Sequence, residues 1–238
     1  MTDSRDLNAV QPTGRGQSGP GAHSARGRLV TDLTTRALHA AMALSFGVAY
    51  LTAESEWWRL WHVAMGYVFV GAAAMRLLYG LLGPRHAQAQ LWWRRGQAAL
   101  RWMFEGLRPA RGLSDWLAKI PLMLVYATIV GLLLAVLPIT ISGLMVHEDW
   151  GPYVLVDVMA ELHEWVGEAM LALIVGHIAG VLVHGWLKRS PYWQRMFNGR
   201  SPERGPDVRD GLQALWLGLS AALLAWFAWS VGSGAWVL

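Results

Sequence analysis

Three histidines lie inside one long apolar stretch, residues 161–187 (ELHEWVGEAMLALIVGHIAGVLVHGWL): His163, His177 and His184. Ionisable side chains at membrane depth are costly and usually functional. On an α-helix, 14 residues turn through about 1400° and rise about 21 Å, which brings His177 to within roughly 40° of His163. One helix face therefore offers an imidazole near each edge of a hydrocarbon core about 30 Å thick.

Two more histidines lie at matching depths in the first two apolar segments of the chain. His39 follows Arg36 near the inner edge of the first segment, and His62 lies just inside the outer edge of the second. Depth alone therefore pairs His62 with His163 and His39 with His177. Two such pairs suit two haem b groups, because neutral imidazole is a normal haem ligand and one histidine approaches each side of the iron. The second axial histidine disfavours oxygen binding and leaves electron transfer as the main chemistry.

Small residues near these histidines leave room for the edges of a macrocycle, although single glycines and alanines are just as common in ordinary helix packing. They are Ala40, Ala41, Gly47, Ala64, Gly66, Gly71, Gly167, Gly176 and Gly180. The alternative interpretation of the histidines is a scatter of hydrogen-bonded imidazoles between helices. That alternative explains one intramembrane histidine well and four at matched depths poorly.

The composition is typical of a membrane protein. Of the 238 residues, 54% are hydrophobic, 15% are charged and 15 are tryptophan, which fits neither a disordered chain nor an ordinary soluble domain. The chain has no cysteine, which excludes disulfides, iron–sulfur clusters held by cysteine and covalently attached haem c. The net charge of +4 does not indicate nucleic-acid binding, because the basic residues lie in loops between apolar segments.

Five apolar segments have close to the roughly 20 residues that a membrane-spanning helix needs. They cover about 33–53, 58–82, 120–146, 161–187 and 211–231. Pro138 lies inside the third segment, and we expect it to kink that helix or to end it early. The pattern predicts an all-α integral membrane protein.

Basic and acidic residues alternate between the loops. Of the 20 lysines and arginines, 19 fall before residue 37, within 76–119 or within 188–209, and Arg59 alone lies in the other two loops. Those two loops and the start of the fourth segment carry eight carboxylates: Glu54, Glu56, Glu148, Asp149, Asp157, Glu161, Glu164 and Glu168. The positive-inside rule therefore places the N-terminus in the cytoplasm and, with five spans, the C-terminus in the periplasm of a bacterial inner membrane.

Two regions are expected to lie outside the spans. Residues 1–30 are rich in Gly, Ser, Pro and Arg and predict a disordered cytoplasmic tail. Residues 88–107 alternate aromatic side chains with arginines, which predicts an amphipathic helix on the inner leaflet. A helix that binds a partner protein is the alternative for this segment.

Three stretches of the chain carry a family resemblance: RALHAAMALSFGVAYLTAE, RLWHVAMGYVFVGAAAMRLLYGLLGPRHA, and HEWVGEAMLALIVGHIAGVLVHGWL followed by RMFNGR. In combination they resemble the bacterial cytochrome b-561 family, which includes the b-type cytochrome subunit of membrane-bound nickel–iron hydrogenases. The most specific features are the two histidines 14 residues apart and the H-x-x-x-G-Y of the second segment. The resemblance covers roughly residues 30–200.

This resemblance implies a four-helix transmembrane bundle that binds two haem b groups and exchanges electrons with quinone and a partner redox protein. Carried over by motif, the axial ligands of the haem irons are His39, His62, His163 and His177, in the pairing that depth gave. The di-haem domain then covers residues 31–200. Residues 201–238 hold a fifth transmembrane helix that is extra to the family's core and that contacts lipid or docks a neighbouring subunit.

The remaining polar residues near the spans are candidates for supporting roles. His184 is one heptad beyond His177 and could replace it as ligand, contact a quinone head group or a haem propionate, or reach the membrane surface. Arg36 and Arg76 lie at the inner edge, where haem propionates need cationic partners, and Arg59 is the outer candidate. Each arginine could equally be a topology anchor.

The acidic outer face indicates the kind of partner. Eight carboxylates against one arginine create a negative field that attracts basic proteins and repels anions. We therefore expect a basic periplasmic redox protein, such as a c-type cytochrome or a dehydrogenase or hydrogenase subunit. The same field argues against oxidation of superoxide, an activity known in the resembling family, because superoxide is an anion.

The sequence as a whole favours a di-haem cytochrome b that passes electrons between this periplasmic partner and the quinone pool of a respiratory chain. We expect an electron-transfer subunit rather than an independent enzyme. Two alternatives remain open at this point. One is a stand-alone membrane oxidoreductase acting on a small substrate such as superoxide or ferric chelates, and the other is a haem-free proton or metal transporter.

Overall fold

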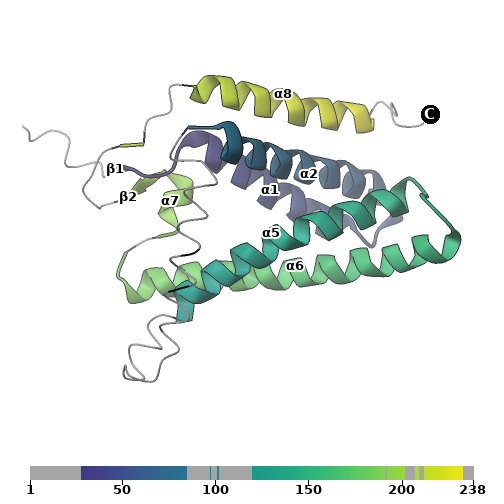
Figure 1. Cartoon of the computed structure of the whole chain (residues 1–238), viewed down its shortest axis with the longest axis horizontal. Coiled ribbons are helices and arrows are strands. Elements are labelled where there is room, and N and C mark those ends of the chain that lie inside the picture. Colours follow the sequence, from purple (N-terminus) through teal and green to yellow (C-terminus); the bar gives the residue numbers. More distant parts are fainter. Residues whose placement is uncertain are drawn as a thin grey trace, which may run out of the picture.

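The computed structural model describes residues 28–84, 97, 101, 120–190, 192–201, 207–208 and 212–232. Five long helices run side by side (Figure 1): α1 (Leu33–Thr52), α2 (Arg59–Leu82), α5 (Ile120–His147), α6 (Tyr153–Leu187) and α8 (Gln213–Gly232). The tail before residue 28 and nearly all of the expected interfacial helix 88–107 lie outside the described residues.

The helices begin and end close to the predicted bounds, with two differences in the α5–α6 hairpin. α5 runs unbroken from Ile120 to His147 with Pro138 inside it, so it does not end early at the proline. α6 begins at Tyr153, eight residues before the predicted segment, and these eight residues are apolar except for Asp157. A helix of 35 residues is about 52 Å long, which exceeds the hydrocarbon thickness.

The helices α1, α2, α5 and α6 form two hairpins. α1 and α2 are joined through the short 3-10 helix η2 (Glu56–Trp58) and pack against each other along their length. α5 and α6 are joined by a tight turn in which Asp149 and Gly151 have φ of 53° and 116°, and they also pack closely. Contacts between the two hairpins are sparse and involve mainly α2 and α5. The two hairpins therefore face each other across a less closely packed region.

Glycines allow the close approach of helices within the α5–α6 hairpin. A Cβ at Gly180 would lie 2.9 Å from Val125 Cγ2 and 3.1 Å from the Pro121 carbonyl oxygen. A Cβ at Gly131 would lie 3.0 Å from the Leu173 side chain. The small residues in this hairpin thus serve helix packing, as in other membrane bundles.

The fifth helix, α8, packs against α2 and also contacts α1. The ring of Phe227 lies over Gly71, where a Cβ would be only 2.8 Å from the phenyl carbon Cδ2. Near the other end of α8, Trp216 and Leu223 cover a buried cluster formed by Leu38, Met75 and Tyr79. α8 therefore completes a small core on the α1–α2 hairpin (Figure 1).

A short antiparallel ribbon closes one end of the bundle. β1 (Arg28–Leu29) precedes α1 and pairs with β2 (Arg200–Ser201), which follows α6 and the one-turn helix α7 (Gln194–Phe197). The carbonyl of Gly199 accepts hydrogen bonds from the backbone N–H groups of Val30 (2.7 Å) and Thr31 (3.2 Å). The ribbon therefore ties the start of the first helix to the chain that leaves the fourth.

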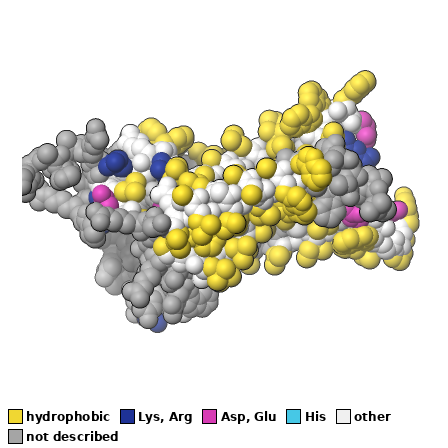
Figure 2. Space-filling model, turned by 90° about the horizontal axis from the view of Figure 1, so that it is seen from above, with side chains coloured by type: hydrophobic (Ala, Val, Ile, Leu, Met, Phe, Trp, Pro, Cys, Tyr) yellow, Lys and Arg dark blue, Asp and Glu magenta, His cyan; other side chains and the backbone are white. Residues whose placement is uncertain are grey.

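Three of the described helical stretches are long and apolar enough to cross a membrane: Glu56–Leu82, Ile120–His147 and Tyr153–Leu187. Hydrophobic side chains cover the length of the bundle, and charged side chains gather at its two ends (Figure 2). The protein is thus an all-α membrane protein. α8 is apolar over a shorter stretch, Gln213–Phe227, and α1 has 20 residues. The predicted count of four spanning helices plus a fifth is therefore met in part.

The packing at Gly180 gives a stability prediction. We expect Gly180→Ala to lower the free energy of unfolding by about 1–3 kcal/mol, because the added methyl group overlaps Val125 and the Pro121 carbonyl. Gly218→Ala is the matched control, since a Cβ there meets nothing within 4 Å and alanine favours a helix. Thermal unfolding in detergent should show a lower midpoint for the first variant alone. Equal midpoints would contradict this account of α5–α6 packing.

Candidate functional site

The histidine rings predicted to pair by depth come together where the two hairpins face each other. His62 projects from α2 and His163 from α6, and their ring centroids are 6.0 Å apart in an edge-on arrangement. His39 of α1 and His177 of α6 lie close enough to interact electrostatically. Each pair thus draws one imidazole from each hairpin. We call them the outer pair (His62 and His163) and the inner pair (His39 and His177).

The ring of His163 on α6 is held by hydrogen bonds to α5. Its Nδ1 lies 3.1 Å from the Ile139 carbonyl oxygen and 3.2 Å from Ser142 Oγ. Because the Ser142 hydroxyl donates to the Pro138 carbonyl at 2.6 Å, its oxygen is left to accept from the ring N–H. Gly143 borders the same ring, and a Cβ there would lie 2.8 Å from His163 Cε1. These contacts favour the tautomer with the proton on Nδ1 and leave Nε2 as the coordinating nitrogen.

His62 is oriented by its own hairpin in the same way. Its Nδ1 lies 2.8 Å from the carbonyl oxygen of Ala49, which belongs to the last turns of α1. A backbone carbonyl has two lone pairs, so Ala49 can accept this bond in addition to the one that the Thr52 hydroxyl donates at 3.1 Å. The outer pair therefore has both Nδ1–H groups bonded to backbone carbonyls within the hairpins.

The inner pair has weaker partners. Thr128 Oγ1 lies 3.5 Å from Nδ1 of His177, at the limit for a hydrogen bond, and the Val125 carbonyl also approaches the ring. His39 makes no hydrogen bond within the described residues, and its neighbours there are His177 and Arg76. His39 is the exposed member of the four.

Two hydroxyl residues on α5 match the two histidines on α6. Thr128 and Ser142 are 14 residues apart, as are His163 and His177, and the helices are antiparallel neighbours. Each hydroxyl donates to the carbonyl four residues earlier, at 2.8 Å for Thr128 and 2.6 Å for Ser142, and each is buried. The sequence analysis missed these two residues. The equal spacing was the available signal, but the register between α5 and α6 was needed to use it.

Open space accompanies the histidines on their own helix faces. Gly66 is four residues beyond His62, and Gly167 is four residues beyond His163, so each glycine lies about one turn along the same face. A Cβ at Gly66 would meet nothing within 4 Å among the described residues, and one at Gly167 would meet only Ile139 Cδ1 at 3.9 Å. A Cβ at Gly47 on α1 also meets nothing. These positions leave room for a flat group between the hairpins.

The donor set identifies the kind of group that fits. Among the described residues there is no cluster of three or more His, Cys, Asp or Glu side chains that could hold a bare metal ion. Two imidazoles per site instead suit a metal that brings its other ligands with it, as the iron of a porphyrin does. The residues present therefore fit haem at both pairs.

The candidate supporting residues have diverse surroundings. Arg76 interacts electrostatically with Asp32, which caps the N-terminus of α1 by accepting from the Thr35 N–H at 2.7 Å, and it also lies near His39. Arg36 donates to the carbonyl oxygen of Phe197 at 2.7 Å. Arg59, at the start of α2, is exposed. The arginine nearest to a histidine pair is thus Arg76.

His184 lies on the side of α6 that faces the chain beyond it. Its ring is 7% exposed and packs edge-on against Tyr192, with centroids 4.7 Å apart, and the guanidinium of Arg195 covers the other side of the tyrosine at 4.2 Å. The Nδ1 atom of His184 has no hydrogen-bond partner within the described part of the chain. In this position His184 does not join His39 and His177.

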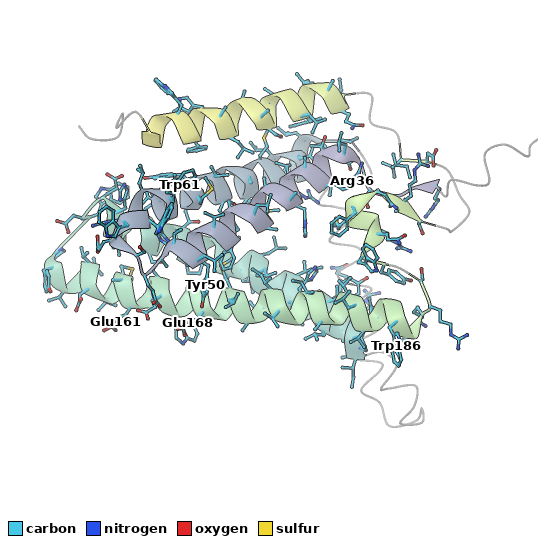
Figure 3. The ribbon with its side chains drawn as sticks, turned by 180° about the vertical axis from the view of Figure 1, so that it is seen from behind. Arg36, Tyr50, Trp61, Glu161, Glu168 and Trp186 are labelled. Atoms are coloured by element: carbon cyan, nitrogen blue, oxygen red, sulfur yellow. The ribbon has the colours of Figure 1, made fainter. Side chains whose placement is uncertain are left out.

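The two ends of the bundle carry opposite charge. Figure 3 shows Glu161 of α6 and Trp61 of α2 toward one end, and Arg36 of α1 toward the end closed by the ribbon. The acidic side chains of α6 form a stripe along one exposed face, because Asp157, Glu161, Glu164 and Glu168 follow the spacing i, i+4, i+7, i+11. We call these four residues the acidic stripe. The outer pair lies at this acidic end and the inner pair toward the basic end.

Comparison with known proteins gives one match. The model of the family described as prokaryotic cytochrome b561 matches residues 30–199, which include both hairpins, α7 and both histidine pairs. No curated protein and no solved structure matches the chain.

The contact at Gly143 gives a prediction for the outer pair. We expect Gly143→Ala to displace the His163 ring, because the added methyl group would overlap Cε1. The purified variant should then bind less haem per chain than the unchanged protein, as counted by the pyridine haemochrome method. Gly218→Ala is again the control, since it adds the same methyl group in open space. Full haem content in Gly143→Ala would contradict the placement of His163.

Proposed function

Because the chain belongs to the prokaryotic cytochrome b561 family, we propose that it passes electrons between a periplasmic redox partner and the quinone pool through two haem b groups. Membership makes it a membrane b-type cytochrome of electron transfer. The observation that supports two haems is the presence of two imidazole pairs, each made by opposite hairpins. The two histidines of α6 are separated by a rise of about 21 Å, so the sites lie near opposite ends of the bundle.

In this proposal the outer haem is held by His62 and His163, and the inner haem by His39 and His177. Haem supplies a one-electron couple when bound. The protein supplies the rest. The carbonyls of Ala49 and Ile139 fix the outer rings so that Nε2 faces the iron position. The open positions at Gly66 and Gly167, each one turn beyond a histidine of the outer pair, would leave room for the macrocycle.

The same arrangement supports the proposed membrane topology. The ribbon end carries Arg36, Arg195 and Arg200, and the opposite end carries the acidic stripe, so the ribbon end faces the cytoplasm by the positive-inside rule. With α1, α2, α5, α6 and α8 all crossing a bacterial inner membrane, the chain would end in the periplasm. Residues 31–200 form the di-haem domain in this scheme, and residues 201–238 add the fifth helix on its α2 side.

Supporting roles follow from position. Arg76 is the best-placed partner for a propionate of the inner haem, since it is near His39 while Asp32 offsets its charge. Arg36 also lies at that end, although one of its nitrogens is committed to Phe197. Arg59 would serve the outer haem. His184, with an unbonded Nδ1 beside Tyr192, remains a candidate contact for a quinone head group.

The proposal makes the histidine pairs testable one by one. We expect His62→Ala and His39→Ala each to lose one of two low-spin b haems, because each removes one axial ligand from a different site. Reduced-minus-oxidised absorption and the pyridine haemochrome method count the haem per chain. His147→Ala, an exposed histidine at the end of α5, should keep both haems. Haem that survives both substitutions would exclude the ligand assignment, and a colourless protein would favour the haem-free transporter.

The acidic stripe supports a basic protein as the periplasmic partner. Its four carboxylates are exposed and lie on the helix that carries His163. Neighbouring like charges along one helix face destabilise each other, so a cationic surface would relieve this repulsion on docking. Docking there would bring a c-type cytochrome or a dehydrogenase or hydrogenase subunit close to the outer haem. The same charges oppose approach of an anion such as superoxide, which disfavours the stand-alone oxidoreductase.

Charge steering predicts a dependence on ionic strength. The rate of electron exchange with a basic c-type cytochrome should fall as salt rises, because screening shortens the range of attraction to about 10 Å at 0.1 M. Glu161→Gln combined with Glu164→Gln should lower the rate at low salt by several-fold. The control is Glu54→Gln combined with Glu56→Gln, which removes two carboxylates from the α1–α2 connection instead. An exchange rate that is insensitive to salt would contradict steering.

A further inference from the structure

The two histidine pairs differ in how strongly their rings donate hydrogen bonds. In the outer pair, Nδ1 of His62 is 2.8 Å from a carbonyl oxygen and Nδ1 of His163 is 3.1 Å from another, with Ser142 Oγ sharing the second bond at 3.2 Å. In the inner pair, the Thr128 hydroxyl is 3.5 Å from Nδ1 of His177, and the Val125 carbonyl also approaches that ring. The described residues provide no hydrogen bond for His39.

This difference bears on the electron affinity of a metal held by the pairs. An imidazole that donates its Nδ1–H to a carbonyl becomes a more basic ligand through its other nitrogen. A more basic axial ligand stabilises the ferric state relative to the ferrous state and so lowers the reduction potential. The hydrogen bonds alone therefore place the outer site below the inner site in potential.

The charges of the bundle act in the same direction, independently of the hydrogen bonds. The acidic stripe lies at the same end of the bundle as His163, and its negative charge favours the more positive ferric iron. At the inner pair, Arg76 interacts electrostatically with His39, and its positive charge favours the ferrous state, although Asp32 offsets part of it. Two separate observations thus agree on the order of the two sites.

We propose that the outer haem has the lower reduction potential and that Ser142 is a positioning residue which helps to set it. The proposal rests on the proposed function, since it assumes that haem occupies both pairs. With haem bound at both pairs, an electron would move downhill from the outer iron, which would be oxidised from ferrous to ferric, to the inner iron, which would be reduced from ferric to ferrous. The periplasmic partner supplies the electron and a quinone accepts it. The protein is thereby biased toward quinone reduction.

The first experiment is a redox titration of the full-length protein in detergent, followed by the visible absorption of haem. We expect two one-electron components whose electron affinities differ by at least about tenfold, which corresponds to about 59 mV in reduction potential. One or two net hydrogen bonds supply enough free energy for this difference. The variant His62→Ala, which lacks the outer haem in our scheme, should retain only the higher component. Retention of only the lower component would overturn the proposed order.

The second experiment separates tuning of potential from general stability. Ser142→Ala should raise the lower of the two reduction potentials, which corresponds to a several-fold increase in electron affinity, and leave the higher potential unchanged. Ser142→Thr should restore the lower potential because the hydroxyl returns. Thr128→Val should change the higher potential by less than about twofold, since its bond to His177 is at the limit of length. Ser45→Ala and Thr140→Val are matched controls, because both hydroxyls bond a carbonyl four residues earlier without touching a histidine.

The outcomes distinguish this inference from the proposed function. Two haems with equal potentials, with the reversed order, or with a larger effect of Thr128→Val than of Ser142→Ala would overturn the inference and leave the di-haem function intact. A protein that binds fewer than two haems would instead contradict the proposed function itself.

Discussion

The N–H groups of imidazoles at membrane depth need hydrogen-bond acceptors. Much of this structure follows from which groups accept those bonds. No water is available in the hydrocarbon core, so an unbonded donor there costs several kcal/mol. The helices within each hairpin provide carbonyls for this purpose. Ala49 of α1 serves His62 of α2, and Ile139 of α5 serves His163 of α6. With one ring nitrogen committed inside its hairpin, the other is directed toward the opposite hairpin.

The packing of the bundle also differs between the inside of each hairpin and the region between the hairpins. Inside the α5–α6 hairpin, Gly131 and Gly180 bring the backbones close, because any Cβ at these positions would overlap the facing helix. At Gly66, on the helix face of His62, and at Gly47, a Cβ would meet no described atom within 4 Å. Glycine therefore has two opposite uses in one fold, close contact within a hairpin and clearance between hairpins. A uniformly tight four-helix bundle would orient the histidines but admit no flat cofactor.

The periodicity of the sequence was sufficient to predict the helices, because helix rise and turn depend on local geometry alone, whereas the histidine pairing as ligands stays a prediction. The pairing of His62 with His163 across two hairpins follows from depth, and the structure places these rings in contact. The early start of α6 was not predicted, although residues 153–160 are apolar except for Asp157. The role of Ser142 could not be predicted either, because it depends on the register between α5 and α6, which no local pattern encodes.

The ribbon that pairs Arg28–Leu29 with Arg200–Ser201 also constrains the order in which the protein assembles. Two-residue strands are unstable alone, and this pair closes a loop of roughly 170 residues, whose entropic cost must be met beforehand. Synthesis must also have passed residue 201. The ribbon is therefore a late contact that forms on a bundle already in place. It holds together the two ends of a domain that has already folded. α8 follows the ribbon in the sequence and packs onto this domain mainly through α2.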